Sequence, residues 1–497
     1  MRTGLTLALL LAGPFAAVAA DVGPTRDAFV ATVDPLGEPV QNVVYLNQGW
    51  APSRSLEFYF TPQGSQIIPY QWFLALEQPD STTPFRDNQN ILRFRYLPQL
   101  PDSKNPDGLP VGFVGDSATN PNWMGLTCAA CHTNEIRYKT TGYRVDGAPT
   151  QGDVRALLSS MIDALQKTLD DPAKFARFAA QVLKNHNDPT SQALLKKQIA
   201  AEIEVRVGYN MRNFPGYNPH VSPAPPPADY GRLDAFGAII NEVFYHAEKS
   251  PAPPTGTSKP ADAPVSYPFL WDTPAQNLVQ WVGLPNGGLN SLARNVGEVL
   301  GVFANYKIPD EHLVFGYPSS VKVVALLQLE DWVKELDSPQ WPTDFPPIDQ
   351  AAAAKGKALY QTNCIRCHVL IDPNSSDPTN TAFMSASGTD PKTYTNIFTR
   401  ISASGKLEGA FDNVVNITSF AKIPPTADAL TMVTNEVIGT ILGDWMGAPT
   451  DEVSRIDMRK KPASMFLSET ATGPKYKARA LNGIWATAPY LHNNSVP

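Results

Sequence analysis

The chain has four cysteines, and each belongs to one of two copies of the pentapeptide Cys-x-x-Cys-His. The two copies comprise Cys128, Cys131 and His132 in "LTCAACHTNEI" and Cys364, Cys367 and His368 in "CIRCH". No cysteine is left over. These residues are therefore the first place to look for chemistry.

Several kinds of chemistry use closely spaced cysteines. Paired cysteines in an exported protein are commonly disulfides, and a Cys-x-x-Cys pair can be a thioredoxin-like redox site. Four cysteines can also hold a zinc ion, although structural zinc sites are compact and these pairs are far apart in the sequence. Neither a disulfide nor a redox pair needs the trailing histidine.

The complete pentapeptide is the attachment signature of c-type haem. Each thiol adds to one vinyl group of the porphyrin, and the adjacent histidine becomes an axial ligand of the iron. The signature occurs twice. The sequence therefore predicts two covalently bound haem c groups, held by Cys128, Cys131 and His132 and by Cys364, Cys367 and His368.

The composition supports a folded protein with long connections. Hydrophobic residues make up 43% and charged residues 18% of the chain, which is enough apolar material for buried cores. The 47 prolines exceed the 33 glycines, which predicts long, stiff loops. The net charge is −7 and no basic tract is present, so neither nucleic acid nor a membrane surface is an expected partner.

The N-terminus has the pattern of a secretory signal peptide. Arg2 precedes an apolar run over residues 5–11, and small residues then lead to a cleavage site after Ala19 or Ala20. The run is too short to cross a bilayer comfortably, and no other segment approaches that length, so no membrane span is expected. Residues 1–20 therefore predict export to the periplasm or the exterior.

Helical periodicity dominates the rest of the chain, so the predicted fold is mainly α. After the first motif, residues 142–153 read as a loop, and Asp153 is an expected N-cap. Helices are predicted over 154–169, 172–183, 191–207, 231–247, 291–304 and 320–336. Proline-rich segments at 220–231 and 250–264 predict loop insertions.

These elements predict two c-type cytochrome-like haem domains, the first heavily elaborated with long loops. The expected N-terminal haem domain covers 21–340, a linker covers 341–350, and the C-terminal cytochrome c-like domain covers 351–497. Before the second motif, Gly356 lies in a helical pattern typical of the first helix of a small cytochrome c, where a glycine permits a close helix crossing.

Several further motifs resemble one family. "GLTCAACHTNEIRY", "GRLDAFG", "PFLWDTP", "LARNVGEVLGV" and "LNGIWATAPYLHNNSV" are similar to segments of the di-haem cytochrome c peroxidase-related proteins. The branch that these motifs resemble most contains rubber oxygenases and di-haem fatty-acid dioxygenases. The resemblance runs from about residue 120 to the end of the chain.

The resemblance implies roles for particular residues. The haem on His132 is expected to be the active one, and the haem on His368 a low-spin electron relay. Trp271 is expected between the haems, whereas from its spacing alone it is better explained as a buried aromatic anchor. Family members often bind a calcium ion between the domains, and the sequence identifies no ligands for one.

The ligand on the far side of the second iron is less well defined. Related chains continue past "PYLHN", and this sequence stops at Pro497, so the C-terminal domain is expected to be truncated. His492 is the histidine in that stretch and is a candidate ligand. Methionines at 384, 432, 446, 458 and 465 are alternatives, although most methionines simply fill cores.

Two functions fit these observations. The first is an exported di-haem oxidoreductase that activates peroxide or dioxygen at the N-terminal haem. Its further partner would be a hydrophobic alkene, as in the oxygenase branch, or a small cytochrome that donates electrons, as in a peroxidase. The second is a non-catalytic electron-transfer cytochrome. The long chain before the second motif favours an enzyme, because a pure electron carrier needs far fewer residues.

Overall fold

The structure is a computed structural model of the 497-residue chain. It describes residues 22–23, 32–33, 39–214, 216–217, 230–248, 259, 261–276, 278–284, 290–310, 316–371, 383–385, 388–412, 421–445 and 473–497. The expected signal peptide, most of the proline-rich segments and three candidate methionine ligands (446, 458 and 465) lie outside these ranges. No helix among the described residues has the length and apolar character needed to cross a membrane.

Two small sheets frame the first cysteine motif. One has the strand order β1 (Val22–Gly23), β4 (Asn42–Leu46), β9 (Thr141–Asp146) and β8 (Thr133–Tyr138). The other has the order β5 (Ile68–Pro69), β7 (Trp123–Leu126) and β6 (Phe113–Asp116). The motif lies between β7 and β8 in the chain, so a strand of a different sheet holds it at each end.

The sequence analysis did not anticipate these strands, and it was wrong to read 142–146 as part of a loop. Strand β9 pairs in parallel with β4 and antiparallel with β8. Residues 142–146 are all buried. The strand does alternate apolar and polar side chains, but it is short, and the turn-forming residues at 147–149 that follow it favour a loop.

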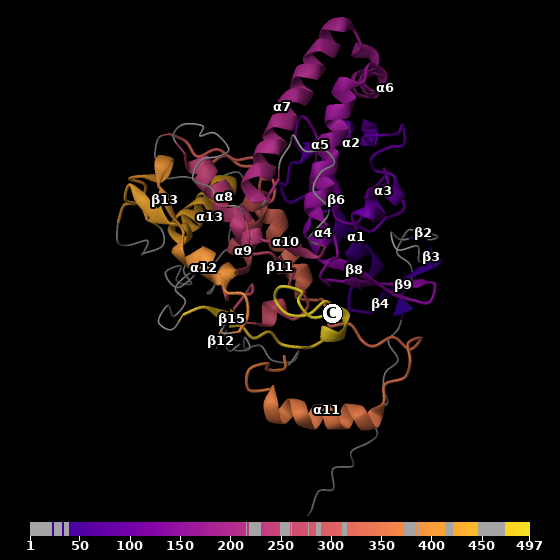
Figure 1. The fold of residues 1–497 in the computed structure, drawn as a ribbon, viewed down its shortest axis with the longest axis vertical. Helices are drawn as coiled ribbons and strands as arrows, with labels where there is room; N and C mark the ends of the chain where they lie inside the picture. The colour runs from indigo at the N-terminus through magenta and orange to yellow at the C-terminus, as the bar shows by residue number, and fades with distance from the viewer. Residues whose placement is uncertain are drawn as a thin grey trace, which may run out of the picture.

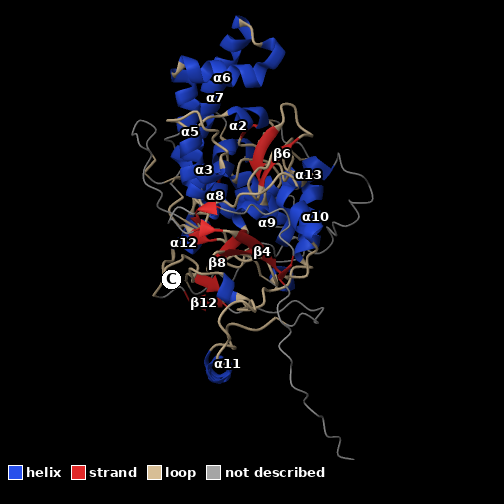
Figure 2. Cartoon of the chain, turned by 90° about the vertical axis from the view of Figure 1, so that its right-hand side faces the viewer, coloured by secondary structure: helices blue, strands red, loops and turns tan. Residues whose placement is uncertain are grey.

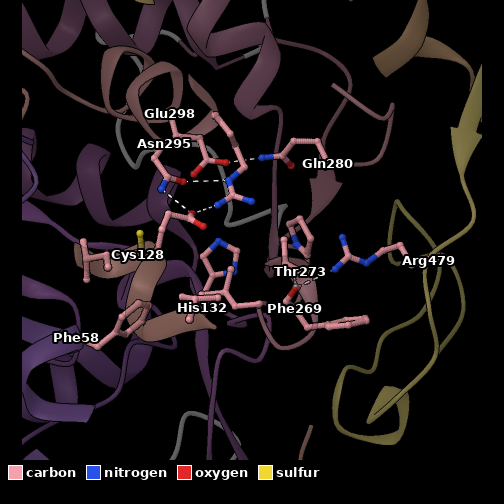
Figure 3. Close-up of a pocket in the computed structure, with 15 residues that line it drawn as sticks. Phe58, Cys128, His132, Phe269, Thr273, Gln280, Asn295, Glu298 and Arg479 are labelled. Carbon is pink, nitrogen blue, oxygen red and sulfur yellow. Dashed lines mark hydrogen bonds and ion pairs between the residues drawn. The ribbon is translucent and has the colours of Figure 1, made fainter. Parts of the chain in front are cut away.

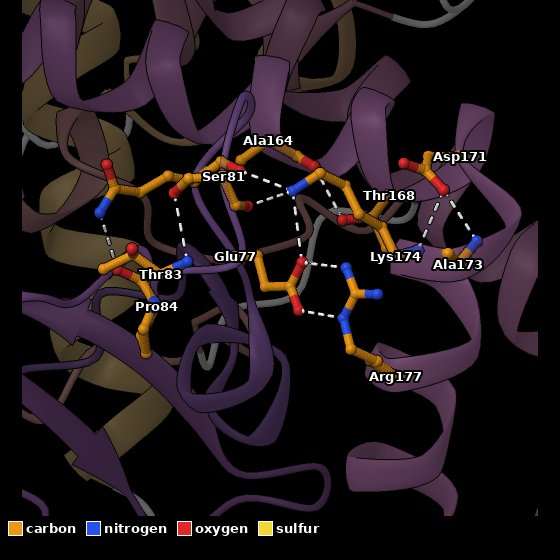
Figure 4. Close-up of polar contacts among 11 residues, drawn as sticks. Glu77, Ser81, Thr83, Pro84, Ala164, Thr168, Asp171, Ala173, Lys174 and Arg177 are labelled. Atoms are coloured by element: carbon orange, nitrogen blue, oxygen red, sulfur yellow. Dashed lines mark hydrogen bonds and ion pairs between the residues drawn. The ribbon is translucent and has the colours of Figure 1, made fainter.

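Three predicted helices form a projection at the top of Figure 1: α5 (Val154–Asp170), α6 (Pro172–Leu183) and α7 (Pro189–Asn213). The predicted cap is confirmed, because the Asp153 carboxylate accepts a hydrogen bond from the Ala156 amide at 2.8 Å. Figure 4 shows how α6 is tied down: Arg177 forks onto both Glu77 oxygens at 2.6 and 2.7 Å, and Lys174 donates to the Gln78 carbonyl at 2.8 Å.

The central helices are α8 (Ala235–Ala247), α9 (Asn290–Gly301), α10 (Val323–Val333), α12 (Lys392–Thr399) and α13 (Ala429–Trp445). Helices α8 and α9 cross closely at Gly301, where an added Cβ would lie within 2.9 Å of the Ile239 backbone. Helix α13 packs on both of them. This packing brings residues from both predicted haem domains into one apolar core. The division into two domains stays a prediction.

The second motif is carried by a helix that stands apart from this core. Helix α11 (Gln350–Asn363) lies at the bottom of Figures 1 and 2, and none of its residues is buried. A Cβ added at Gly356 would meet no atom within 4 Å among the described residues. The helix is therefore confirmed, whereas the close crossing expected at Gly356 is not formed by the described residues.

The remaining elements are short. They are α1 (Pro52–Phe60), α2 (Tyr70–Ala75), α3 (Asn88–Arg93), α4 (Cys128–Cys131), and the strand pairs β2–β3 (Thr32–Val33, Pro39–Val40), β10–β11 (Arg232–Leu233, Val265–Ser266), β12–β15 (Phe383–Ser385, Lys475–Lys477) and β13–β14 (Ile401–Ala403, Thr426–Asp428). Single 3-10 turns occur at Lys184–His186, Thr273–Ala275, Gly405–Leu407 and Ile484–Ala486.

Candidate cofactor sites at the two cysteine motifs

The first motif is fixed by its own backbone and by its neighbours. The Thr127 hydroxyl donates to the Tyr59 carbonyl at 2.9 Å and accepts from the Ala129 amide at 3.3 Å, which caps the single turn of α4. The His132 amide donates to the Cys128 carbonyl at 2.8 Å. Gly112, with φ +82°, lies so close that an added Cβ would meet Ala130 at 2.1 Å. The motif is therefore held rigidly.

Two adjoining cavities surround His132. The smaller has a volume of about 30 Å³ and is lined by Cys128, and the larger has a volume of about 110 Å³ and is lined by Cys131. The residues that line both cavities are His132, Pro268, Gln280, Arg294 and Glu298.

The donor set of this site suits a covalently attached haem. Each thiol lines one of two cavities that share the His132 imidazole, and thioether attachment and axial ligation need these three groups close together. The four cysteines are free thiols, and no group of three or more His, Cys, Asp or Glu side chains gathers among the described residues. The compact four-cysteine zinc site is therefore not assembled.

Burial makes the first thiols unsuited to redox exchange. It raises the pKa of Cys128 and of Cys131 to about 12, and the Glu298 carboxylate adds to the effect. A reactive dithiol needs a lowered thiol pKa, so that the nucleophilic thiolate is populated. This electrostatic setting disfavours a thioredoxin-like pair at this motif.

His132 is held neutral by the same surroundings. Burial lowers the pKa of its imidazole to about 3, the Arg294 guanidinium lowers it further, and the Pro268 carbonyl acts in the opposite direction. The side chain is 8% exposed. A neutral imidazole keeps a lone pair available, which is the form that binds a metal.

Charged and polar side chains from α9 and α10 face His132, as Figure 3 shows. Arg294 pairs with Glu330, which also accepts from the Asn295 amide at 2.7 Å. The Gln280 amide donates to Glu298. Burial raises the pKa of Glu298, although Arg294 opposes the shift. Glu298 is therefore a half-buried acid of raised pKa that lines the same cavities as the candidate iron ligand.

The sequence analysis missed this cluster. Arg294 and Glu298 are four residues apart in "LARNVGEVLG" and so share one face of α9, a signal that was available. That spacing is common on solvated helix faces, however. Only the folded chain shows that this face points at His132.

Trp271 is both a buried anchor and a neighbour of the first site. Its side chain is fully buried, and its indole N–H donates to the Asn482 carbonyl at 2.8 Å. Its ring stacks on Phe269 with 4.7 Å between centroids and 19° between planes. Phe269 lines the smaller cavity beside His132. Both interpretations of Trp271 therefore remain compatible with the structure.

The histidine of the second motif is more exposed than that of the first. All four cysteines are half-buried, whereas His132 is buried and His368 is half-buried. The Nδ1 atom of His368 lies 2.7 Å from the Arg479 carbonyl oxygen, to which the Nδ1–H tautomer donates. Metal-binding histidines commonly orient their rings by such a bond, which leaves Nε2 free for the metal. His368 is therefore posed as a ligand.

The ring of His492 contacts aromatic side chains. Its ring stacks on Tyr476 at 4.2 Å and meets the edge of Trp281 at 6.3 Å. Within the described part of the chain, none of these contacts joins it to His368. Met432 is fully buried in the core, and Met384 lies in β12. The second ligand of the second iron stays a prediction, and so does the calcium ion.

Comparison with known proteins identifies the class. Residues 475–497 match the family described as RoxA-like, cytochrome c-like. The uncharacterized protein y4iJ of Sinorhizobium fredii is 31% identical over 513 residues, which cover 92% of this chain and 80% of y4iJ. The uncharacterized protein y4iM of the same bacterium is 22% identical over 61% of this chain and 62% of its own length.

Two cysteine–histidine motifs, one of them opening onto the cavities around its histidine, define a c-type cytochrome with covalently bound haem c. The similarity to y4iJ covers most of both chains. The chain therefore belongs to one family with y4iJ, and its residues 475–497 match the RoxA-like, cytochrome c-like family.

Proposed function

We propose that the protein is an exported di-haem oxidoreductase. It activates peroxide or dioxygen at a haem attached to Cys128 and Cys131, and a second haem at Cys364 and Cys367 relays electrons. The observation that carries the proposal is that the buried His132 borders cavities that are also lined by an acid of raised pKa, Glu298. A pure electron carrier has no use for an acid at that position.

The chain's own groups have distinct tasks in this proposal. A bound haem supplies the iron redox chemistry, and the protein supplies orientation, protons and electrostatics. Burial raises the pKa of Glu298, which favours the protonated carboxyl, and a protonated carboxyl can give its proton to an oxygen atom of the oxidant. Gln280 orients the Glu298 carboxyl by donating to it.

Arg294 provides a fixed positive charge beside the same space. Its pairing with Glu330 keeps the guanidinium in place, and its side chain is 9% exposed. A preorganised charge in an enclosed site stabilises developing negative charge more strongly than water does. This arrangement favours cleavage of an oxygen–oxygen bond.

The stacked pair of Phe269 and Trp271 supports the relay role of the second haem. Phe269 borders the first cavity. The Asn482 carbonyl accepts from Trp271, and the Asn482 side-chain oxygen accepts from the Ile371 amide at 3.4 Å, three residues beyond His368. Trp271 therefore lies on one described set of contacts that leads from one motif toward the other.

The larger cavity favours a hydrophobic organic substrate. Apart from the shared polar groups, its walls are mostly apolar side chains from α8, α9 and α13, among them Phe236, Ile239, Val433 and Val437. Such a lining suits an alkene chain, such as polyisoprene or an unsaturated fatty acid. If the reaction is instead a peroxidase reaction, the reductant is a small cytochrome.

Two sets of measurements test the proposal. Absorption and electron paramagnetic resonance spectra of the purified holoprotein should show one haem whose spectrum changes on addition of cyanide. Two low-spin haems that both ignore cyanide would instead indicate a non-catalytic electron-transfer cytochrome. Oxidant consumption is then measured with oleate or polyisoprene under air, and separately with peroxide and reduced cytochrome. If the oxidant is consumed in neither assay, the enzyme proposal is wrong.

A further inference from the structure

Arg479 is a buried cation without a carboxylate partner in the described part of the chain. Its side chain is 4% exposed, and Nη2 donates to the Phe269 carbonyl at 2.8 Å. Its Nε atom is buried and has no hydrogen-bond partner. Other buried arginines differ: Arg212, for example, forks onto both oxygens of Glu242 at 2.7 and 3.0 Å.

An unpaired buried charge is costly, so it is usually compensated by a group that binds beside it. Asp272 is close enough to influence Arg479 electrostatically, although the two form no ion pair. Arg294, the other cation of the cavity, repels it. The space that the guanidinium faces is the smaller cavity. The missing negative charge is therefore expected from whatever fills that cavity.

The position of Arg479 identifies the chemistry of that negative charge. In Figure 3 the sulfur of Cys128 lies on one side of the His132 ring, and the guanidinium of Arg479 lies on the opposite side. A haem c has its two thioether links toward one edge and its two propionate carboxylates at the opposite edge. A haem anchored at Cys128 and ligated by His132 thus extends its carboxylates toward Arg479.

We propose that the Arg479 guanidinium binds the propionate carboxylates of the haem at the first motif. The inference rests on the haem attachment contained in the proposed function and on no particular reaction. Arginine suits this task because its planar fork of N–H groups matches a carboxylate. The free Nε of Arg479 supplies the additional donor that such a contact uses.

The same residue touches the second site through a different atom. The backbone carbonyl of Arg479 accepts from His368, whereas its side chain belongs to the first cavity. Substitution of the side chain leaves that carbonyl in place. The proposal therefore predicts a change confined to the first haem, although one residue borders both sites.

The test is a potentiometric titration of holoprotein variants. Loss of a positive charge near the first haem disfavours its reduced form, so Arg479→Gln should lower the midpoint potential of that haem and leave the second unchanged. Arg479→Lys keeps the charge and should stay close to the parent value. Lys475→Gln removes one charge from strand β15, four residues before Arg479 and outside both cavities, and should change neither potential.

Three results would overturn the proposal. They are an unchanged first potential in Arg479→Gln, an equal shift at both haems, and an equal shift in Arg479→Lys. If Arg479→Gln yields too little holoprotein, Arg479→Met, which keeps the apolar contact with the Phe269 ring, is titrated instead and judged by the same results. Failure of haem attachment is seen separately, by mass spectrometry of the Cys128–Cys131 peptide of the parent protein.

Discussion

The two Cys-x-x-Cys-His motifs share their residues and spacing and differ in their surroundings. The first lies between strands β7 and β8, and its histidine is buried between two cavities. The second follows α11, a helix without buried residues, and its histidine is half-buried. The pentapeptide thus specifies attachment, whereas the surrounding protein decides whether an attached iron meets an enclosed reaction space.

The two motifs also differ in the charged groups and pKa shifts around them. Burial raises the pKa of both first-motif thiols and lowers that of His132, and it places Glu298 and Arg294 beside them. At the second motif, the described feature is a hydrogen bond from His368 to a carbonyl. The first motif thus has ionisable side chains around its histidine, whereas at the second motif a hydrogen bond orients the histidine.

The largest expected effect comes from exchanging the histidines for alanine. His132→Ala should abolish oxidant consumption, because it removes the proposed ligand of the reactive iron. His368→Ala should chiefly alter the redox behaviour of the second haem, as read by potentiometry. His186→Ala, in an exposed turn, is the control. Equal loss of all function in the His132 and His368 variants would contradict the proposal that the two haems have different roles.

Glu298→Gln should give the next largest effect. General acid catalysis contributes roughly 10²–10⁴-fold, so turnover should fall by about that factor while the haem content stays the same. Since the pKa of Glu298 is raised, the parent rate should fall as the pH rises through that value, and the variant should lose this alkaline limb. Glu202→Gln, on α7 and outside both cavities, is the control. A rate close to the parent would remove Glu298 from the mechanism.

The Trp271→Phe variant distinguishes a role of Trp271 in electron transfer from a purely structural role. Phenylalanine keeps most of the packing on Phe269 and loses the hydrogen bond to Asn482, which costs about 1 kcal/mol of unfolding free energy. A relay role predicts clearly slower electron transfer between the haems, followed by stopped-flow spectroscopy, at this small cost in stability. Unchanged transfer would leave Trp271 as an anchor, for which Trp271→Ala should cost about 3–5 kcal/mol.

Gly356→Ala has the smallest expected effect and tests whether α11 stands free. With no atom within 4 Å of an added Cβ, alanine should stabilise the helix by about 0.5–1 kcal/mol. Thermal denaturation of the holoprotein, followed at the second haem, measures this change. Destabilisation there would show that α11 crosses another helix closely in the haem-loaded protein, as the sequence pattern predicted.

Local patterns were enough for the attachment chemistry and for the helices. Each pentapeptide contains all the atoms that form two thioether bonds and one iron ligand, so its meaning does not depend on the fold. The cap at Asp153 and the helix of 350–363 also follow from neighbouring residues, and the structure confirms both. Such features can be predicted because the interactions that create them span only a few positions.

Tertiary structure decided which motif lies in an enclosed cavity and which groups face it. The first cavity combines residues near positions 58, 130, 270, 295, 330 and 479, and no local pattern connects these segments. The raised pKa of Glu298 and the unpaired charge of Arg479 arise from burial, which is a property of the assembled chain. The sequence alone therefore predicted haem attachment, and the packing of distant segments determined which of the two motifs is enclosed.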